Sequence, residues 1–353
     1  MCSSDLEFVG NPTNVNVAYV DLKSPLTGFR YAATPSTFSV SDATVTACTE
    51  GVRVVSGSPT FSRMSTTCSS YGLVADATSG EWLDAAMDAA DELQVAYTLS
   101  DGRATELDFL YRDAAGTWST PYVVDDGSAD IGSYVSIAVD SSNLPSFAYF
   151  DADNGVPTLT DYTTFGVGVT SSIDINYTGA TGYFTSIALD SSDWDYVAYY
   201  DDGLTAGEVQ MAVPLEPTFS EVVDEDPGWY VSLAMRSDDV PCAAWQAVTD
   251  ADLRYGCRDA SDNWSIETVD STGAVGVEAA LAFDASDNPW IAYYDESNGD
   301  LKVATAKSGT WTILTVDSVG DVGLAPSIVV SGGYVYISYY DADKGVLKYA
   351  VGR

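Results

Sequence analysis

Short apolar runs alternate with turns rich in Gly and Asp along most of the chain, and the runs recur in the same order. The stretch PWIAYYDESNGDLKVATA (residues 289–306) contains an apolar run, two aromatics, an Asp, a Gly turn and a second apolar run. YVYISYYDADKGVLKYA (334–350) repeats this order. Runs of this length bounded by turn residues predict pairs of strands joined by tight turns.

An aromatic residue two positions before the recurring acidic position marks each repeat. It stands at Tyr19, Tyr97, Tyr149, Tyr199, Trp245, Tyr293 and Tyr339. The successive spacings are 78, 52, 50, 46, 48 and 46 residues. All but the first agree with one blade of a β-propeller, which takes roughly 40–50 residues. The excess in the first spacing predicts an inserted loop or hairpin around residues 45–75.

Each repeat contains four runs that predict four strands. Examples are SIALD (186–190) for the first strand, WIAYY for the second, LKVAT for the third and TWTILTVD for the fourth. The second and third runs are almost continuously apolar, as expected for sheets covered on both faces by neighbours. We therefore predict an all-β chain in which residues 7–353 form a single seven-bladed β-propeller of four-stranded antiparallel blades. The N-terminal blade lacks its first strand and is expected to be truncated; two β-sandwiches are the alternative.

Charge and residue types exclude several function classes. The 353 residues carry 52 acidic and 14 basic side chains, for a net charge of −38. Such a surface repels phosphates, so we expect neither nucleic acid nor anionic lipid as a partner. No run of eighteen apolar residues predicts a membrane span. The chain has no His, which excludes Ser-His-Asp catalysis and His-ligated zinc.

The first residues and the cysteines bear on the protein's location. MCSSDL resembles the translated end of a sequencing adapter, so residues 1–6 are expected to be a non-native leader on a metagenomic gene that lost its signal peptide. Cys242 and Cys257 face each other if the hairpin around VTDA pairs Ala247 with Asp252, which favours a disulfide over a buried reduced pair. Cys48 and Cys68 then form a second disulfide by elimination.

The recurring acidic residues predict a ligand-binding surface. In a propeller the loops after the second and fourth strands share one face, and both loop types are acidic here. We predict an acidic ring on this face, made by Asp21, Asp151, Asp201, Asp295, Asp341, Asp270 and Asp317.

Two of these loops have the spacing Asp-x-Asp-x-Gly, in DADNG (151–155) and DADKG (341–345). Closely spaced carboxylates suit Ca²⁺, so the candidate ligands are Asp151, Asp153, Asp341 and Asp343. The alternative is a tight turn in which the Asp accepts backbone N–H groups and the Gly takes positive φ. No cofactor is required, and Ca²⁺ is the one candidate ion.

The stretch LAFDASDNPWIAYYDESNGDLKVATAKSGTWTILTVDSVGDVG resembles a tandem propeller repeat of secreted bacterial and archaeal proteins of uncharacterised activity. This resemblance covers residues 14–353 and implies the fold rather than an activity. RDAAGTW (112–118) and KSGTW (307–311) are distantly similar to the Asp-box of sialidase-like propellers. That similarity implies three clustered arginines, and no motif here brings three together.

These observations lead to two functional hypotheses. The favoured one is a monomeric, secreted or cell-surface propeller, a binding or scaffold module whose acidic loop face holds an extracellular protein, a glycan or a divalent cation. The alternative is a polysaccharide-active enzyme, a glycoside hydrolase or lyase, that uses Asp and Glu carboxylates without His. Since no acidic pair stands out from the repeat, we favour the role without catalysis.

Overall fold

The computed structural model describes two compact parts of the chain, Met1–Gly80 and Glu81–Arg353. In the second part it describes residues 82–353 except 91, 101–104, 114–118, 120, 126–130, 162–170, 176–180, 203–206, 214–215 and 308. In the first part it describes the backbone of nine strands between Leu6 and Ala75. No helix in the described residues is long and apolar enough to cross a membrane.

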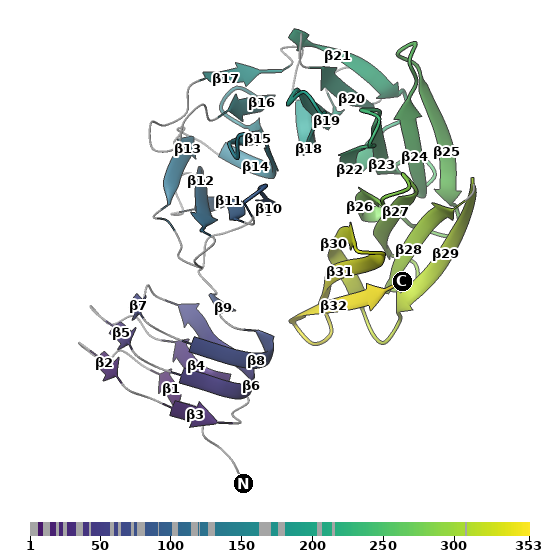
Figure 1. The fold of residues 1–353 in the computed structure, drawn as a ribbon. Coiled ribbons are helices and arrows are strands. Elements are labelled where there is room, and N and C mark those ends of the chain that lie inside the picture. Colours follow the sequence, from purple (N-terminus) through teal and green to yellow (C-terminus); the bar gives the residue numbers. More distant parts are fainter. Residues whose placement is uncertain are drawn as a thin grey trace. The chain divides into compact units, whose positions relative to one another are not determined.

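The second part is a β-propeller of six blades (Figure 1), each an antiparallel sheet in chain order. Blade 1 consists of β10 (Leu83–Met87), β11 (Leu93–Ser100), β12 (Thr105–Arg112) and β13 (Tyr122–Asp125). Blade 2 consists of β14 (Ile131–Val139), β15 (Pro145–Asp151), β16 (Val156–Asp161) and β17 (Ser171–Asp174). Blade 3 consists of β18 (Thr181–Leu189), β19 (Asp195–Asp201), β20 (Glu208–Val213) and β21 (Glu216–Asp224). Blade 4 consists of β22 (Gly228–Met235), β23 (Pro241–Ala247), β24 (Asp252–Arg258) and β25 (Trp264–Asp270). Blade 5 consists of β26 (Val277–Phe283), β27 (Pro289–Asp295), β28 (Asp300–Lys307) and β29 (Thr310–Asp317). Blade 6 consists of β30 (Val322–Ser331), β31 (Tyr334–Asp341) and β32 (Val346–Gly352).

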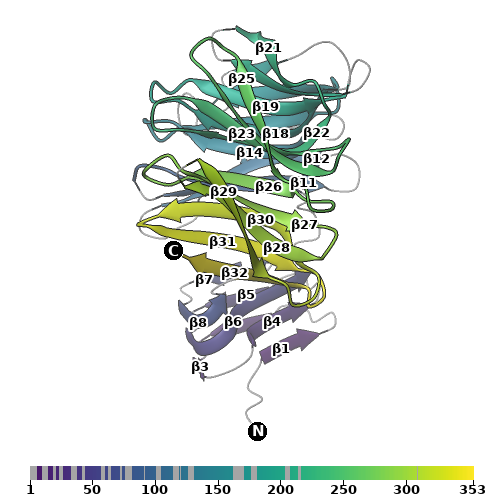
Figure 2. The same cartoon turned by 90° about the vertical axis from the view of Figure 1, so that its right-hand side faces the viewer.

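The first strand of each blade is innermost and the last is outermost (Figure 1). Seen from the side, β25 and β29 lie outside the inner strands of their blades (Figure 2). The second strands are the most buried: every residue of β15, β23 and β27 is buried. Their almost continuous apolar sequence follows from this burial, because neighbouring blades cover both faces.

The prediction of seven blades is wrong, because the structure has six. The repeat marked by Tyr19 is not a blade: β2 (Val15–Ala18) pairs in parallel with β5 (Phe38–Ser41), whereas blade strands pair antiparallel. Tyr19 itself lies outside the described residues. An alternating apolar run predicts a strand but not the direction of its partner, and this led to the extra blade. Among the described residues blade 6 has three strands, whereas blades 1 to 5 have four each.

The first part of the chain contains two parallel sheets. One has the order β1 (Leu6–Val9), β4 (Thr27–Ala32), β6 (Thr44–Ser56) and β3 (Asp21–Lys23), with β8 (Ser65–Tyr71) and β9 (Val74–Ala75) also paired to β6. The other is β2, β5 and β7 (Thr60–Ser62). The β6–β8 register places Cys48 opposite Cys68. The Cys48–Cys68 disulfide stays a prediction.

Five of the aromatic residues that mark the repeats lie between adjacent blades. Tyr149, Tyr199, Trp245 and Tyr293 are fully buried, and Tyr339 is nearly so. Cluster residues from two blades meet at each junction; for example, Leu301 and Val303 of blade 5 pack with Ile337 and Tyr339 of blade 6. The repeat residue is therefore a core residue of the ring.

Blade 4 contains the predicted disulfide. Cys242 in β23 pairs with Cys257 in β24, and the two sulfurs are bonded. The register places Ala247 opposite Asp252, as the hairpin argument required. The prediction for Cys242–Cys257 is confirmed.

Candidate functional site

The centre of the six-bladed ring holds a cavity of about 670 Å³. The first strands of all six blades contribute to its wall, together with the residue before β10. The lining residues are Trp82, Leu83, Asp84, Tyr134, Phe184, Tyr230, Ser232, Glu278, Ala280, Leu281, Ala325, Pro326, Ser327 and Ile328.

Four aromatic side chains form a series along this wall. The ring centroids of Trp82 and Tyr134 are 4.1 Å apart, those of Tyr134 and Phe184 4.7 Å, and those of Phe184 and Tyr230 4.7 Å. These are contact distances for aromatic pairs. Each blade from 1 to 4 thus contributes one aromatic side chain to a continuous half-ring, which we call the aromatic series.

The four aromatics occupy equivalent positions of their blades. In each blade, the residue just before the repeat aromatic pairs with a residue of the first strand, as Ala148 pairs with Ser136. The aromatic of the series stands two residues before that first-strand residue, as Tyr134 stands before Ser136. In blades 5 and 6 the same position holds Glu278 and Ala325. The cavity therefore has an aromatic side and a side with a carboxylate and a small residue.

The backbone at this position has positive φ. The values are +58° at Tyr134, +56° at Phe184, +57° at Tyr230, +53° at Glu278 and +46° at Ala325. The register of the first two strands shifts just there, as in a β-bulge. Positive φ is unfavourable for bulky residues, and such strain concentrates at ligand-binding positions.

Hydrogen bonds between neighbouring first strands hold the series in place. The carboxylate of Asp84 accepts the N–H of Ile137 at 2.9 Å. Ser136 Oγ accepts the N–H of Ile187 at 3.2 Å. The same bonds join Ser186 Oγ to Leu233 N at 2.9 Å and Ser232 Oγ to Leu281 N at 3.0 Å. One side-chain oxygen of each of blades 1 to 4 thus fixes the next blade's first strand.

The polar side chains of the cavity include two phenols, Tyr134 and Tyr230, and two carboxylates, Asp84 and Glu278. Burial and the neighbouring Glu278 and Glu296 carboxylates raise the pKa of Tyr230, and burial also raises the pKa of Tyr134. Both phenols therefore stay protonated at neutral pH. Glu278 accepts a hydrogen bond from the backbone N–H of Ala325. No Lys or Arg lines the cavity in the part of the chain that the structure describes.

The predicted acidic residues after the second strands lie inside their turns. Asp151, Asp201, Asp295 and Asp341 are buried, and the last two have no exposed surface. Asp151 accepts the backbone N–H of Asp153 at 2.8 Å and the Nδ2 of Asn154 at 2.7 Å. Asp341 accepts hydrogen bonds from the Lys344 N–H at 2.9 Å and its Nζ at 2.7 Å. Asp21 lies in β3, and its side chain is outside the described residues.

The acidic residues that end the fourth strands bind the next blade. Asp270 accepts the Tyr293 hydroxyl at 2.8 Å and pairs with Lys302 Nζ at 3.3 Å. Asp317 accepts the Tyr339 hydroxyl at 2.8 Å and pairs with Lys348. Burial opposes ionisation of Asp317, but the bonds from Lys348 and Tyr339 prevail and lower its pKa to about 2.

The candidate calcium ligands are not brought together in groups. No cluster of three or more His, Cys, Asp or Glu suited to a metal ion occurs among the described residues. Asp343 Oδ2 accepts the backbone N–H of Asp321 at 3.1 Å, and Asp153 is exposed in the turn after β15. Calcium binding stays a prediction.

A pair of half-buried carboxyls bears on the enzyme hypothesis. Asp161 at the end of β16 and Asp195 at the start of β19 both hydrogen-bond Ser146. Burial, and then the Asp161 charge, raises the pKa of Asp195 to about 7. Neither residue lines the central cavity. The pair is therefore not placed to act on a substrate bound there.

The sequence argument missed the aromatic series, although the sequence contains its signal. Tyr134, Phe184 and Tyr230 each stand two residues before the Ser of a first strand, in YVSIAVD, FTSIALD and YVSLAMR. The prediction used the acidic residues after the second strand, which stand later in each repeat.

Comparison with known proteins supports the fold only. No family model matches the chain, and the search of curated proteins gives no match. The structure is similar to a point mutant of the NanB sialidase from Streptococcus pneumoniae, with TM-score 0.52 and 11% identity over 78% of this chain and 68% of that one. It is also similar to the six-bladed, fucose-recognising lectin of Aleuria aurantia, with TM-score 0.50 and 13% identity over 77% and 93% of the two chains. Puromycin hydrolase gives TM-score 0.52 and 11% identity over 76% of this chain and 46% of its own length.

Proposed function

We propose that the chain is a carbohydrate-binding propeller that takes its ligand in the central cavity. The aromatic series of Trp82, Tyr134, Phe184 and Tyr230 carries this proposal. Aromatic faces stack on the apolar faces of sugar rings, while nearby hydroxyl and carboxylate groups bond the sugar hydroxyls. The tyrosine hydroxyls and Glu278 offer such groups.

Size, charge and fold support the same ligand class. A cavity of about 670 Å³ lies within the usual size range of small-ligand pockets, roughly 300–1,000 Å³. The net charge of −38 disfavours anionic sugars and favours neutral ones. The lectin of Aleuria aurantia recognises fucose on a six-bladed propeller, which makes a lectin role compatible with this fold.

The proposal places the protein outside the cell, as a secreted or surface-attached module. The Cys242–Cys257 disulfide supports this location, because disulfides persist in oxidising compartments.

Ligand binding by the acidic loop face also stays open to test. Asp153→Asn and Asp343→Asn would alter that face without touching the central cavity.

A glycan array followed by calorimetry tests the proposal. We expect the unaltered chain to bind a neutral glycan, and Trp82→Ala to weaken that binding about tenfold, a typical effect of losing one aromatic contact. Trp194→Ala is the matched control, since Trp194 is an exposed tryptophan outside the cavity. Equal binding by all three proteins, or no binding to any neutral glycan, contradicts the proposal.

Release of reducing sugar from the bound glycan distinguishes binding from catalysis. We expect no release above the rate without protein. Release that Glu278→Gln abolishes would replace the lectin function with the glycosidase alternative.

A further inference from the structure

The cations of the chain lie on aromatic rings outside the central cavity. A cation within roughly 6 Å of a ring centroid is attracted to the aromatic face. Three such pairs occur among the described residues, Lys307 on Trp290, Lys348 on Tyr339 and Arg353 on Tyr334, at 4.6, 5.4 and 5.2 Å. No described Lys or Arg lies over a ring of the aromatic series. The series therefore presents its rings to a cation that a ligand brings.

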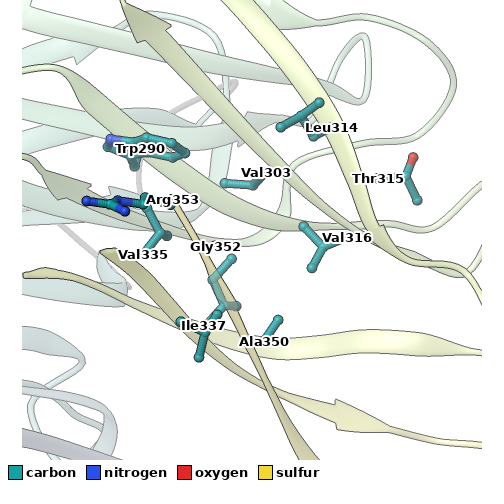
Figure 3. A pocket seen from close by; sticks show the side chains of 11 residues that line it. Trp290, Val303, Leu314, Thr315, Val316, Val335, Ile337, Ala350, Gly352 and Arg353 are labelled. Atoms are coloured by element: carbon teal, nitrogen blue, oxygen red, sulfur yellow. The ribbon is translucent and has the colours of Figure 1, made fainter. Parts of the chain in front are cut away.

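Another cavity, between blades 5 and 6, has the opposite character (Figure 3). Its volume is about 260 Å³, and its lining side chains are apolar except for Thr315 and Arg353. Trp290 and Arg353 lie together in Figure 3, and Lys307 lies on the same Trp290 ring. Since two cations of the chain already lie at Trp290, this smaller cavity is unsuited to a cationic ligand.

Glu278 provides the central cavity with a carboxylate that is held in place. It occupies the position of the aromatic series in blade 5. Its Oε2 accepts the backbone N–H of Ala325 in blade 6, which fixes the carboxylate. Its Oε1 accepts no hydrogen bond from the described residues, and none of their Lys or Arg side chains pairs with it. One oxygen is thus available to a ligand.

This oxygen adjoins the end of the aromatic series. The negative charge of Glu278 contributes to the raised pKa of Tyr230, the last aromatic of the series, so the two side chains are near each other. The other lining carboxylate, Asp84, already accepts hydrogen bonds at both oxygens, from the N–H groups of Ala85 and Ile137 and from the Ser136 hydroxyl. Glu278 is therefore the lining carboxylate that can take a ligand cation.

Resting on the carbohydrate function proposed above, we propose that the central cavity selects a sugar with a protonated amine, whose ammonium group lies between the aromatic series and Glu278. The ammonium N–H groups donate to Glu278 Oε1, and the aromatic faces attract the charge. The rest of the sugar ring stacks on the series as before. The net charge of −38, which disfavours anionic sugars, attracts a cationic one to the protein.

Calorimetry of the full chain with two matched sugars tests this inference. The probes are a β-linked glucosamine disaccharide and its N-acetylated form, which differ only in the acetyl groups and the amine charge. At about pH 6 a primary amine keeps its proton. We expect the amine form to bind at least tenfold more tightly, because the cation gains both an aromatic contact and a charge-assisted hydrogen bond. Added salt should reduce this preference by screening the charges.

Two variants locate the preference in the central cavity. Glu278→Gln removes the charge but keeps the shape of the side chain, and it should abolish the preference for the amine form. Glu267→Gln is the matched control, since Glu267 is an exposed residue of β25 outside the cavity, and it should leave the preference unchanged. A thermal melt of each variant, together with its binding of the acetylated form, checks that it is folded.

The two sugars separate failure of this inference from failure of the carbohydrate function. Equal affinity for both sugars, or a preference that persists in Glu278→Gln, overturns the inference and leaves the carbohydrate function intact. Binding of neither sugar overturns the inference, and the glycan array then decides the carbohydrate function. Binding of the amine form alone, lost in Glu278→Gln, supports the inference and contradicts the expectation of a neutral ligand.

Discussion

The carboxylate of Asp193 accepts two hydrogen bonds from Ser141 of the preceding blade, from its backbone N at 2.8 Å and its Oγ at 2.5 Å. Asp239 accepts the same two bonds from Ser191, and Asp287 from Ser237. Each of these Asp residues has positive φ, which points its carboxylate back across the junction. The loops between first and second strands therefore connect blades 2 to 5 in series through these Ser–Asp pairs.

Removal of one Ser–Asp pair should lower stability in a pH-dependent way. The hydrogen bonds from Ser191 lower the pKa of Asp239 below its usual value of 3.8. A carboxyl whose pKa is lower in the folded state stabilises the fold above the pKa of the unfolded state, and this contribution is lost as pH falls through the folded pKa. Asp239→Ala should thus lower the thermal midpoint at pH 7, and the difference should shrink as the pH falls below 3.8.

The neighbouring residue provides the control for this prediction. Asp238 is exposed and makes a surface ion pair with Arg236 at 3.1 Å. Asp238→Ala should leave the midpoint at pH 7 almost unchanged, because exposed ion pairs contribute little. If the two variants melt alike, the Ser–Asp pairs do not hold the blades together.

The repeat could be predicted because each blade has the same burial pattern. Tyr149, Tyr199, Trp245 and Tyr293 recur at nearly constant spacing since each fills one junction between blades. The number of blades could not be counted in the same way. The run around Tyr19 has the alternation of a strand, and only its parallel pairing separates it from the blades.

Loss of Lys302 should destabilise the fold strongly. Its Nζ lies 2.6 Å from an Asp295 carboxylate that has no exposed surface, and 3.3 Å from the Asp270 carboxylate. Lys302→Met leaves two buried carboxylates without their cation, which typically costs about 3–5 kcal/mol. Urea unfolding at pH 7 measures this loss as a lower midpoint.

Lys344→Met is the comparison for Lys302→Met. Lys344 also pairs with a buried carboxylate, that of Asp341 at 2.7 Å, but its own side chain is 56% exposed. Its removal should cost less than about 1 kcal/mol, because Lys344 itself is largely in water and Lys348 remains 3.3 Å from the carboxylate. Equal losses of unfolding free energy in Lys302→Met and Lys344→Met would show that burial of the lysine does not determine how strongly its removal destabilises the fold.

The candidate site was harder to predict than the fold, because the acidic residues have a structural use that their spacing does not reveal. Asp295 and Asp341 follow the second strand in the pattern of a ligand loop, yet their oxygens bind their own turns and the neighbouring lysines. The aromatic series depends on positive φ at Tyr134, Phe184 and Tyr230. The residue types at these positions do not predict that backbone conformation.

Removal of calcium tests the remaining metal prediction. Asp151 and Asp341 already accept hydrogen bonds within their turns, and Lys344 places an ammonium group on Asp341. We therefore expect the same thermal midpoint with excess EDTA as with millimolar Ca²⁺. A midpoint that rises with Ca²⁺ concentration would demonstrate binding to the folded state, and Asp153→Asn would then locate it in the 151–155 turn.

The half-buried carboxyl pair of Asp161 and Asp195 predicts a stability change of opposite sign to that of the Ser–Asp pairs. Burial and the Asp161 charge raise the pKa of Asp195 to about 7, above its usual 3.8. A carboxyl whose pKa is higher in the folded state destabilises the fold once it must ionise, so stability falls as pH rises from about 4 to 7. Asp195→Asn removes this penalty while keeping the shape of the side chain. The variant should match the unaltered chain at pH 4 and exceed it at pH 8 by about 2–4 kcal/mol in urea unfolding.

Asp193→Asn, two residues earlier, is the control, because the pKa of Asp193 is lowered by its bonds from Ser141. That variant should be less stable than the unaltered chain at pH 8, the reverse of Asp195→Asn. A gain for Asp195→Asn that is equally large at pH 4 would mean that the asparagine improves packing or hydrogen bonding near Ser146 rather than relieving a buried charge.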